Sequence, residues 1–294
     1  MPFRKRPIKS LTLYAWLSLI LLLLGPVALC AQETKESKVP AKEPAKEQKA
    51  APDKNAPKVA AGKLTAEQVA ELAIYFHGSR QVLQQIRRTG LEHGRIVRNA
   101  ANGKTEEATY DLRFARGESA EKDKLRLDQQ MPTIEYSLIY NTGKVFGLLK
   151  GAVFIPRQDA ADDLLVDSRR GIEALLRYKE NGATLSLSGK EKLQNVECHI
   201  LDLTDKEGRV THYYISVKYF RVLWTEYEEI APNGAKTAYK RRYYDYRYAQ
   251  GTLVPFRSVL YRDGQQISEI QVLTVTYGAK VDDAIFLNPE QAAK

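Results

Sequence analysis

Residues 237–277 read TAYKRRYYDYRYAQGTLVPFRSVLYRDGQQISEIQVLTVTY and have the pattern of a series of β-strands. It is rich in tyrosine, valine, leucine and isoleucine, which favour extended backbone on a half-buried sheet surface. We expect three strands in it, over Thr237–Tyr248, Leu253–Tyr261 and Ile267–Tyr277. Because short turns such as Asp263-Gly264 link these strands, consecutive strands are predicted to be antiparallel neighbours.

The same pattern continues toward the N-terminus. Four more strands are expected in the second half of the chain, at Thr184–Ser188, Val196–Thr204, Val210–Val217 and Arg221–Ile230. Five are expected in the first half, at Gly94–Asn99, Glu107–Arg116, Lys122–Gln129, Glu135–Tyr140 and Lys144–Leu149. Asn141-Thr142-Gly143 is typical of a hairpin turn between the last two of these strands. The predicted fold class is therefore α+β, mainly antiparallel β.

Two segments have helical rather than strand periodicity. Thr65 and Gln68 form a predicted capping box, and apolar residues then recur along one helix face over residues 65–88. His77-Gly78 interrupts this helical region. A second apolar stripe predicts a helix over Asp159–Lys179 and consists of Leu164, Ile172, Leu175 and Leu176.

The first 31 residues have the layout of a secretory signal peptide. Basic residues precede an apolar run from Leu11 to Leu24, and small residues follow this run up to Ala31. The run is shorter than the roughly 20 residues of a comfortable membrane span, which favours a cleaved signal over a retained anchor. Cys30 is also a candidate lipidation site, although Leu29 is atypical directly before a lipidated cysteine.

Residues 32–63 form a predicted disordered linker of Lys, Glu, Ala and Pro, without an aromatic residue to bury. The export segment carries +4 and the linker +3 of the formal net charge of +9, which leaves +2 on residues 64–294. A nearly neutral domain lacks the basic surface that binds phosphate backbones, which argues against a nucleic-acid partner. The predicted parts of the chain are thus 1–31, 32–63 and one domain over 64–294.

Motifs of known catalytic sites are missing from the sequence. It contains no phosphate loop, dinucleotide fingerprint, Gly-x-Ser-x-Gly elbow or His-Glu-x-x-His motif. The four histidines lack metal-ligand spacing, so neither a metal nor a cofactor is predicted. Cys198 and His199 are adjacent, and neighbouring side chains of a strand point to opposite faces, which argues against a Cys–His catalytic pair. We therefore expect no enzyme activity.

Several short motifs along residues 64–290 resemble the LolA-like superfamily of periplasmic lipoprotein carriers, also labelled outer-membrane lipoprotein-sorting proteins. They are Gly78–Ile86 with Gly94-Arg95-Ile96, Lys124-Leu125-Arg126 with Tyr140-Asn141-Thr142-Gly143, Tyr244-Asp245-Tyr246-Arg247, Gly251–Pro255 and Val281–Pro289. The resemblance implies a strongly curved antiparallel sheet, an incomplete β-barrel, with helices covering its concave face. It also implies an acyl chain or lipid held between the sheet and the helices.

Apolar side chains of the predicted strands and helices are the candidates for lining such a hollow. They are Leu125, Leu127, Ile139, Phe146, Leu164, Ile172, Leu176, Val222 and Trp224. Each methylene that a ligand buries against them contributes about 0.8 kcal/mol. Ordinary core packing is the competing interpretation of every one of these positions.

The function implied by the resemblance is a non-catalytic periplasmic carrier or binder of lipid or lipoprotein acyl chains. Such a protein serves outer-membrane lipoprotein sorting or envelope lipid transport, with the lipoprotein machinery of the inner or outer membrane as its partner. Two alternatives remain open: a tethered sensor or interaction module of the envelope, and a structural envelope protein without a ligand. A lipidated Cys30 favours these alternatives, because a fixed protein does not shuttle.

Overall fold

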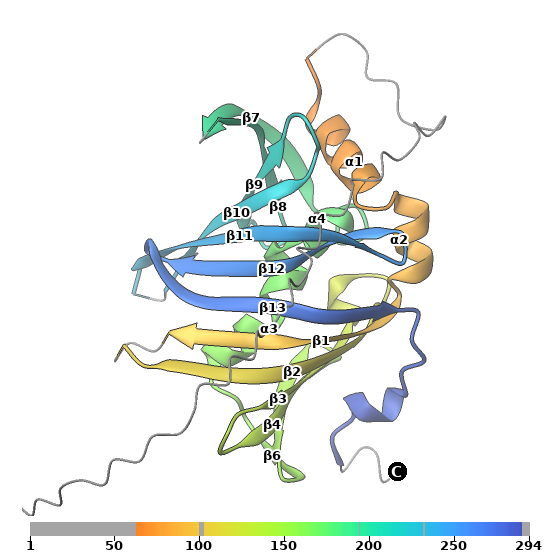
Figure 1. Ribbon diagram of the computed structural model, residues 1–294, viewed down its shortest axis with the longest axis vertical. Helices are drawn as coiled ribbons and strands as arrows, with labels where there is room; N and C mark the ends of the chain where they lie inside the picture. The colour runs from red at the N-terminus through yellow and green to blue at the C-terminus, as the bar shows by residue number, and fades with distance from the viewer. Residues whose placement is uncertain (1–62, 100–102, 194, 232, 290–294) are drawn as a thin grey trace, which may run out of the picture. The chain divides into compact units, whose positions relative to one another are not determined.

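The computed structural model describes residues 63–99, 103–193, 195–231 and 233–289 (Figure 1). The predicted export segment with Cys30, and all but the last residue of the predicted linker, lie outside these residues. Within the described ranges, no helix is long and apolar enough to cross a membrane.

The described residues form one antiparallel sheet of 13 strands (Figure 1). The strands are β1 (Thr89–Asn99), β2 (Thr105–Ala115), β3 (Lys124–Gln130), β4 (Glu135–Asn141), β5 (Lys144–Leu149), β6 (Ala152–Phe154), β7 (Thr184–Leu193), β8 (Val196–Thr204), β9 (Val210–Ser216), β10 (Val222–Ile230), β11 (Lys236–Ala249), β12 (Thr252–Arg262) and β13 (Gln265–Tyr277). Their order in the sheet is β6-β5-β4-β3-β2-β1-β13-β12-β11-β10-β9-β8-β7. Two meanders are thus joined where β1 pairs with β13.

The strand pattern of the sequence is confirmed, and so is the mainly antiparallel fold class. Thr142 and Gly143 have φ of 48° and 79°, as the predicted hairpin turn between β4 and β5 requires. The sequence analysis missed β6, which has only three residues. The sheet is open, with β6 and β7 as its two edges.

The first helical region consists of α1 (Ala66–Phe76) and α2 (Arg80–Ile86), and the predicted capping box of Thr65 is present. Gly78 separates the two helices with a φ of 136°. A Cβ at Gly78 would lie 3.2 Å from the Gly251 carbonyl oxygen, because this turn packs on the turn between β11 and β12. Only glycine combines that φ with so close an approach.

The second helical region is divided, whereas the sequence predicted one helix over Asp159–Lys179. The structure has α3 (Gln158–Arg170) and α4 (Ile172–Leu176), with Gly171 between them in extended conformation. A Cβ at Gly171 would lie 2.7 Å from the Asp167 carbonyl oxygen. This close approach lets the chain change direction between the helices. Two 3₁₀ turns complete the elements, η1 (Ala120–Lys122) and η2 (Asp283–Phe286).

Apolar side chains on one face of the sheet pack against the helices in two clusters. The α1–α4 cluster includes Val69, Ala73, Ile74, Ile172, Leu175, Leu176, Leu201, Tyr213, Ile215 and Val222. The α3 cluster includes Phe114, Leu125, Leu138, Tyr140, Leu164, Leu165 and Tyr277. Burial of one such side chain contributes about 1.5–3 kcal/mol, so these contacts hold the helices on that face.

The C-terminal segment packs on β3 and β4 from the other face. Arg126 donates to the Ile285 carbonyl oxygen at 2.9 Å, and Asn141 donates to the Phe286 carbonyl oxygen at 3.2 Å. Asp282 caps η2, because its side chain accepts a hydrogen bond from the Ala284 amide. Strands β3 and β4 are therefore packed against other elements on both faces.

Candidate functional site

A cavity of about 410 Å³ lies between α3 and the sheet, and we call it the α3 cavity. Its lining comes from α3, from β1 to β4 and from β11 to β13. Ligand pockets in proteins typically have volumes of about 300–1,000 Å³, so the α3 cavity has the size of a small-molecule site.

The lining of the α3 cavity combines apolar side chains with charged ones such as Glu92, Asp163 and Arg241. Ile96 and Tyr110 of this lining are buried with Ala108 in one apolar cluster. Packed against them, with part of their surface exposed, are Leu112, Leu127, Met131 and Ile270. Apolar surface left in contact with water costs about 25 cal/mol per Å² relative to burial. An apolar ligand in this cavity removes that cost.

Two polar pairs lie in the wall of the α3 cavity. The Tyr110 hydroxyl donates to Glu92 at 2.7 Å. Desolvation raises the pKa of Glu92, and the hydrogen bond from Tyr110 opposes this rise. Arg241 on β11, 5% exposed, forms an ion pair at 3.0 Å with Asp167 on α3. This ion pair ties the helix to the sheet at the boundary of the cavity.

Gly94 explains how Tyr110 reaches the base of the cavity. Gly94 lies opposite Tyr110 in the pairing of β1 with β2. A Cβ at Gly94 would lie 2.6 Å from the Tyr110 hydroxyl oxygen and 2.5 Å from the Gln271 carbonyl oxygen. The missing side chain therefore leaves the space in which the tyrosine ring lies across β1 and approaches Glu92.

The exposed end of the α3 cavity is polar. Arg157 and Asp159, just before and within the first turn of α3, form an ion pair at 2.7 Å and are largely exposed. Deeper in, Gln129 accepts hydrogen bonds from Tyr136 at 2.5 Å and from Arg98 at 3.3 Å. A lining that has both apolar and polar side chains suits an amphiphile, whose hydrocarbon part contacts the apolar side chains and whose polar end contacts the polar ones.

Six of the nine predicted lining residues lie on the helix-covered face. Leu127 and Leu164 line the α3 cavity itself. Leu125 is buried in the α3 cluster next to it. The remaining three lie in the α1–α4 cluster and are Ile172, Leu176 and Val222.

Ile139 and Phe146 lie on the other face of the sheet. They are opposite each other in the pairing of β4 with β5. Ile139 alternates along β4 with Leu138, which lines the α3 cavity, and side chains of successive strand residues point to opposite faces. Ile139 is fully buried on the face where η2 packs.

Trp224 also lies away from the helices. A bulge between Val222 and Trp224 shifts the register of β10 against β9 and turns the indole to the other face. There the indole stacks on Tyr214 with ring centroids 4.4 Å apart. The sequence pattern did not predict the bulge, which determines the face of the sheet that Trp224 occupies.

Cys198 and His199 offer no catalytic pair. Cys198 is a free, buried cysteine, and burial raises the pKa of its thiol to about 11. Burial lowers the pKa of His199, whose ring stacks on Phe220 with centroids 5.9 Å apart. Over the described residues, no group of three or more His, Cys, Asp or Glu side chains is placed to hold a metal ion.

Of the residues that line the α3 cavity, only Leu127 and Leu164 were predicted, and the polar residues missed include Glu92, Tyr110 and Arg241. Arg241 was detectable in principle. It shares a face of β11 with Tyr239 and Tyr243, whereas Lys240 and Arg242 point to the other face. Glu92 and Tyr110 lie on β1 and β2, and only the pairing of these strands brings them together.

Comparison with known proteins identifies the fold. No family model matches this chain, and no curated protein matches it in sequence. Among solved structures, it is similar to a DUF1329 family protein from Desulfovibrio piger, with a TM-score of 0.56, 13% identity and coverage of 78% of this chain and 99% of that one. It is also similar to a LolA superfamily protein from Nitrosomonas europaea, with a TM-score of 0.55, 12% identity and coverage of 76% and 98%.

A third similar structure is a domain from Vibrio parahaemolyticus described as an outer membrane lipoprotein-sorting protein. Its TM-score is 0.52 and its identity 13%, with coverage of 78% of this chain and all of that one. At such identities the likeness concerns the fold alone. The chain therefore has a LolA-like fold, which confirms at this level the resemblance seen in its short motifs.

Proposed function

We propose that this LolA-like chain binds a lipid or lipoprotein acyl chain in the α3 cavity, as a non-catalytic carrier or binding protein of the cell envelope. One observation carries the proposal: an apolar cluster next to α3 remains partly uncovered around a cavity of about 410 Å³. A hydrocarbon chain gains about 0.8 kcal/mol for each methylene buried there. The LolA superfamily protein and the lipoprotein-sorting domain of similar fold support the choice of ligand class.

We further infer that the sheet curves around α3 and α4 as an incomplete barrel. In the sheet order, six strands separate β3 from β9. At about 4.8 Å between neighbours, a flat sheet would hold β3 and β9 about 34 Å apart. Yet Lys206, in the turn between β8 and β9, forms an ion pair at 3.5 Å with Glu121, just before β3. This contact supports a bend that brings the two halves toward each other.

The ligand-lining set of the proposal is Leu127 and Leu164 together with Leu112, Met131 and Ile270. Leu125 belongs to the packed wall behind the cavity. Ile172, Leu176 and Val222 hold α1 and α4 on the sheet and support the neighbouring helix α3. Ile139, Phe146 and Trp224 are not included, because they lie on the other face.

The predicted signal segment places the proposed activity in the periplasm, where acyl chains of lipoproteins and lipids need a protected path through water. The basic and apolar pattern before Ala31 is the support for export. The proposed partners are lipids or lipoproteins and the membrane machinery that delivers or receives them. A tethered envelope sensor that uses the same cavity is the alternative, and a diacylated Cys30 in the mature protein would favour it.

The experiment that tests the proposal reduces the cavity without changing the outer surface. Ile270→Trp places a larger side chain in the α3 cavity, whereas Leu273→Trp, on the same strand, changes a side chain that is 54% exposed and does not line the cavity. The probe is lysophosphatidylcholine with one palmitoyl chain, titrated calorimetrically into delipidated protein. Displacing about two methylenes costs about 1.6 kcal/mol, so we expect Ile270→Trp to weaken binding about tenfold.

Leu273→Trp should bind the probe as the wild type does. Two results would overturn the proposal: no measurable binding of the probe to the wild-type protein, or equal loss of binding in both variants. Far-ultraviolet circular dichroism of each variant checks that the sheet is intact before the titration.

A further inference from the structure

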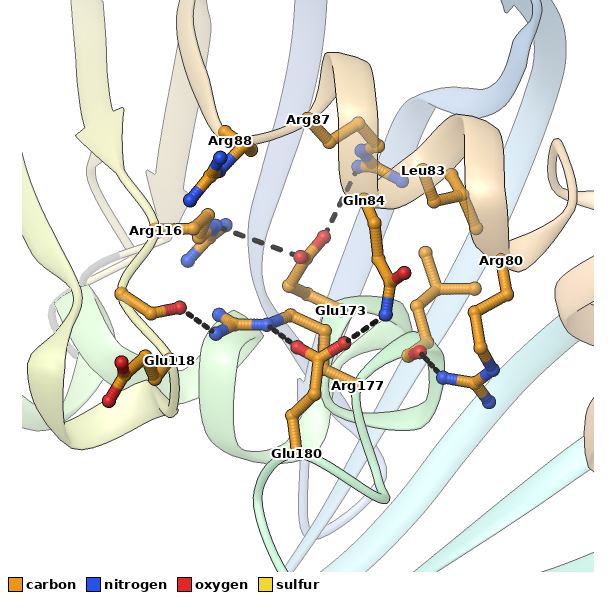
Figure 2. A pocket seen from close by; sticks show the side chains of 12 residues that line it. Arg80, Leu83, Gln84, Arg87, Arg88, Arg116, Glu118, Glu173, Arg177 and Glu180 are labelled. Atoms are coloured by element: carbon orange, nitrogen blue, oxygen red, sulfur yellow. Dashed lines mark hydrogen bonds and ion pairs between the residues drawn. The ribbon is translucent and has the colours of Figure 1, made fainter.

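A second hollow of about 410 Å³ lies away from the α3 cavity and shares no lining residue with it. It lies between α2, α4 and the segment that follows β2 (Figure 2). Five arginines line it, and we call it the arginine cleft: Arg80, Arg87, Arg88, Arg116 and Arg177. Three glutamates, Glu118, Glu173 and Glu180, are the acidic side chains of the lining.

Two buried carboxylates fix the deeper arginines in place. Glu173 lies between Arg87 at 3.4 Å and Arg116 at 3.6 Å (Figure 2). Asp123, whose side chain is 1% exposed, lies between Arg116 at 3.0 Å and Arg177 at 2.8 Å. The guanidinium groups are thus held before any ligand arrives, so little side-chain entropy is lost on binding.

The carboxylates of the arginine cleft do not satisfy all of its donors. Arg88 is exposed, and its guanidinium has no hydrogen bond or ion pair to any described residue. Arg116 meets Glu173 through Nε and Asp123 through Nη1, and Arg87 meets Glu173 through Nη2, so Nη2 of Arg116 and Nη1 of Arg87 have no carboxylate partner among the described residues. Glu118 is engaged by Lys122, and Glu180 by Arg177 and Gln84. The cleft is therefore rich in donors and short of acceptors.

An oxyanion would supply the hydrogen-bond acceptors that the arginine cleft lacks. A guanidinium presents N–H groups in a planar fork that matches the oxygens of carboxylate or phosphate. Arg87 and Arg88 enter the cleft from the end of α2, and Arg116 enters from the end of β2 (Figure 2). Donors from separate directions suit a tetrahedral group with several charged oxygens better than a planar carboxylate. Leu83 and Leu176 add an apolar wall for the organic part of an ester.

We propose that the arginine cleft binds a phosphoryl group, either of a free phosphate ester or of a phospholipid headgroup, through Arg88 together with the fixed Arg87 and Arg116. This site goes beyond the proposed acyl-chain function and stands independently of it. Because Arg88 is exposed and unpaired, its substitution removes a ligand contact without breaking the buried ion pairs.

The test is an NMR titration of the purified protein that follows arginine Nε–Hε signals, with inorganic phosphate as the probe and sodium chloride at matched ionic strength as the reference. We expect phosphate, but not chloride, to shift the signals of Arg87 and Arg116. Arg88→Ala should weaken the binding of phosphate at least about fivefold, which corresponds to about 1 kcal/mol. Arg262→Ala, which removes an equal charge from an exposed position on β12 outside the cleft, should leave it unchanged.

A second arm identifies the source of the phosphoryl group. Vesicles of phosphatidylcholine with phosphatidylglycerol are compared for binding to wild-type protein, Arg88→Ala and Arg262→Ala. Binding that depends on Arg88 in either arm supports the site, and the arm in which it occurs assigns a free ester or a lipid headgroup. Absence of Arg88-dependent binding in both arms overturns the proposal, as does an equal effect of both variants.

Discussion

His77 is a fully buried histidine, and burial favours its neutral form in the folded protein. Its Nδ1–H donates to the Ala73 carbonyl oxygen at 2.8 Å, and its ring lies edge-on to Tyr246. Burial lowers the pKa of His77 to about 4, from an ordinary value of 6.5. The unfolded chain therefore binds a proton between these two pH values that the folded protein does not bind.

We predict that this histidine makes stability fall as the pH falls from 6.5 to 4. The contribution is fully present above pH 6.5 and amounts to roughly 3 kcal/mol, since each pKa unit corresponds to about 1.36 kcal/mol. Urea unfolding at pH 7, 5.5 and 4.5 measures it as the difference between wild type and His77→Phe. If the free energy of unfolding changes with pH by the same amount in wild type and His77→Phe, the pKa of His77 is not lowered by folding.

For single residues, the sequence predicted which side chains are buried better than it predicted which face of the sheet they occupy. All nine candidate lining residues are buried or partly buried, but a bulge turns Trp224 away from the helices, and Ile139 and Phe146 follow the alternation of their strands to the other face. The contacts that shape the α3 cavity depend on strand pairing, as with Gly94 and Tyr110. Such contacts join distant parts of the chain and leave no local pattern in the sequence.

For helices and turns, the sequence predicted the features that depend on neighbouring residues of the chain. The capping box of Thr65 is present in both directions, with the Thr65 amide donating to Gln68 at 2.9 Å and the Gln68 amide donating to Thr65 at 3.2 Å. The division of α3 from α4 at Gly171 was missed. Its cause is a close approach to Asp167, which in turn pairs with Arg241 on a distant strand.

We predict that Thr65→Ala destabilises the protein by about 1 kcal/mol, because it leaves a backbone N–H of the first turn of α1 without its side-chain acceptor. Urea unfolding measures the change. Thr65→Ser keeps the hydroxyl and should remain within a few tenths of a kcal/mol of the wild type. If Thr65→Ser loses as much stability as Thr65→Ala, the hydroxyl is not what stabilises the start of α1.

At the scale of the whole domain, the curvature of the sheet decides whether the α3 cavity is enclosed. The ion pair between Glu121 and Lys206 spans six intervening strands, and both side chains are accessible to a reagent. We predict that a zero-length carbodiimide reagent joins these two residues, with the cross-linked peptide identified by mass spectrometry. The pair Glu118 and Lys122, four residues apart, is the positive control for reactivity. Cross-linking of the control pair alone would mean that the sheet does not bend enough.

The patterns of the separate strands do not predict how far the sheet bends, because the bend depends on the sum of small twists over many strands. What it supplied was the alternation and turn chemistry of the separate strands, from which an antiparallel meander follows. The LolA-like fold was recognisable only through motifs whose order along the chain matched, and its confirmation came from structures of about 13% identity.

We propose that the α3 cavity holds a hydrocarbon chain. Native mass spectrometry of the protein purified without detergent tests this binding. We expect a bound species with the mass of a lipid or acylated compound, which is released by organic extraction and is less abundant in Ile270→Trp. A protein that shows only its own polypeptide mass, and that takes up no lipid when mixed with an extract of bacterial membranes, would contradict the account.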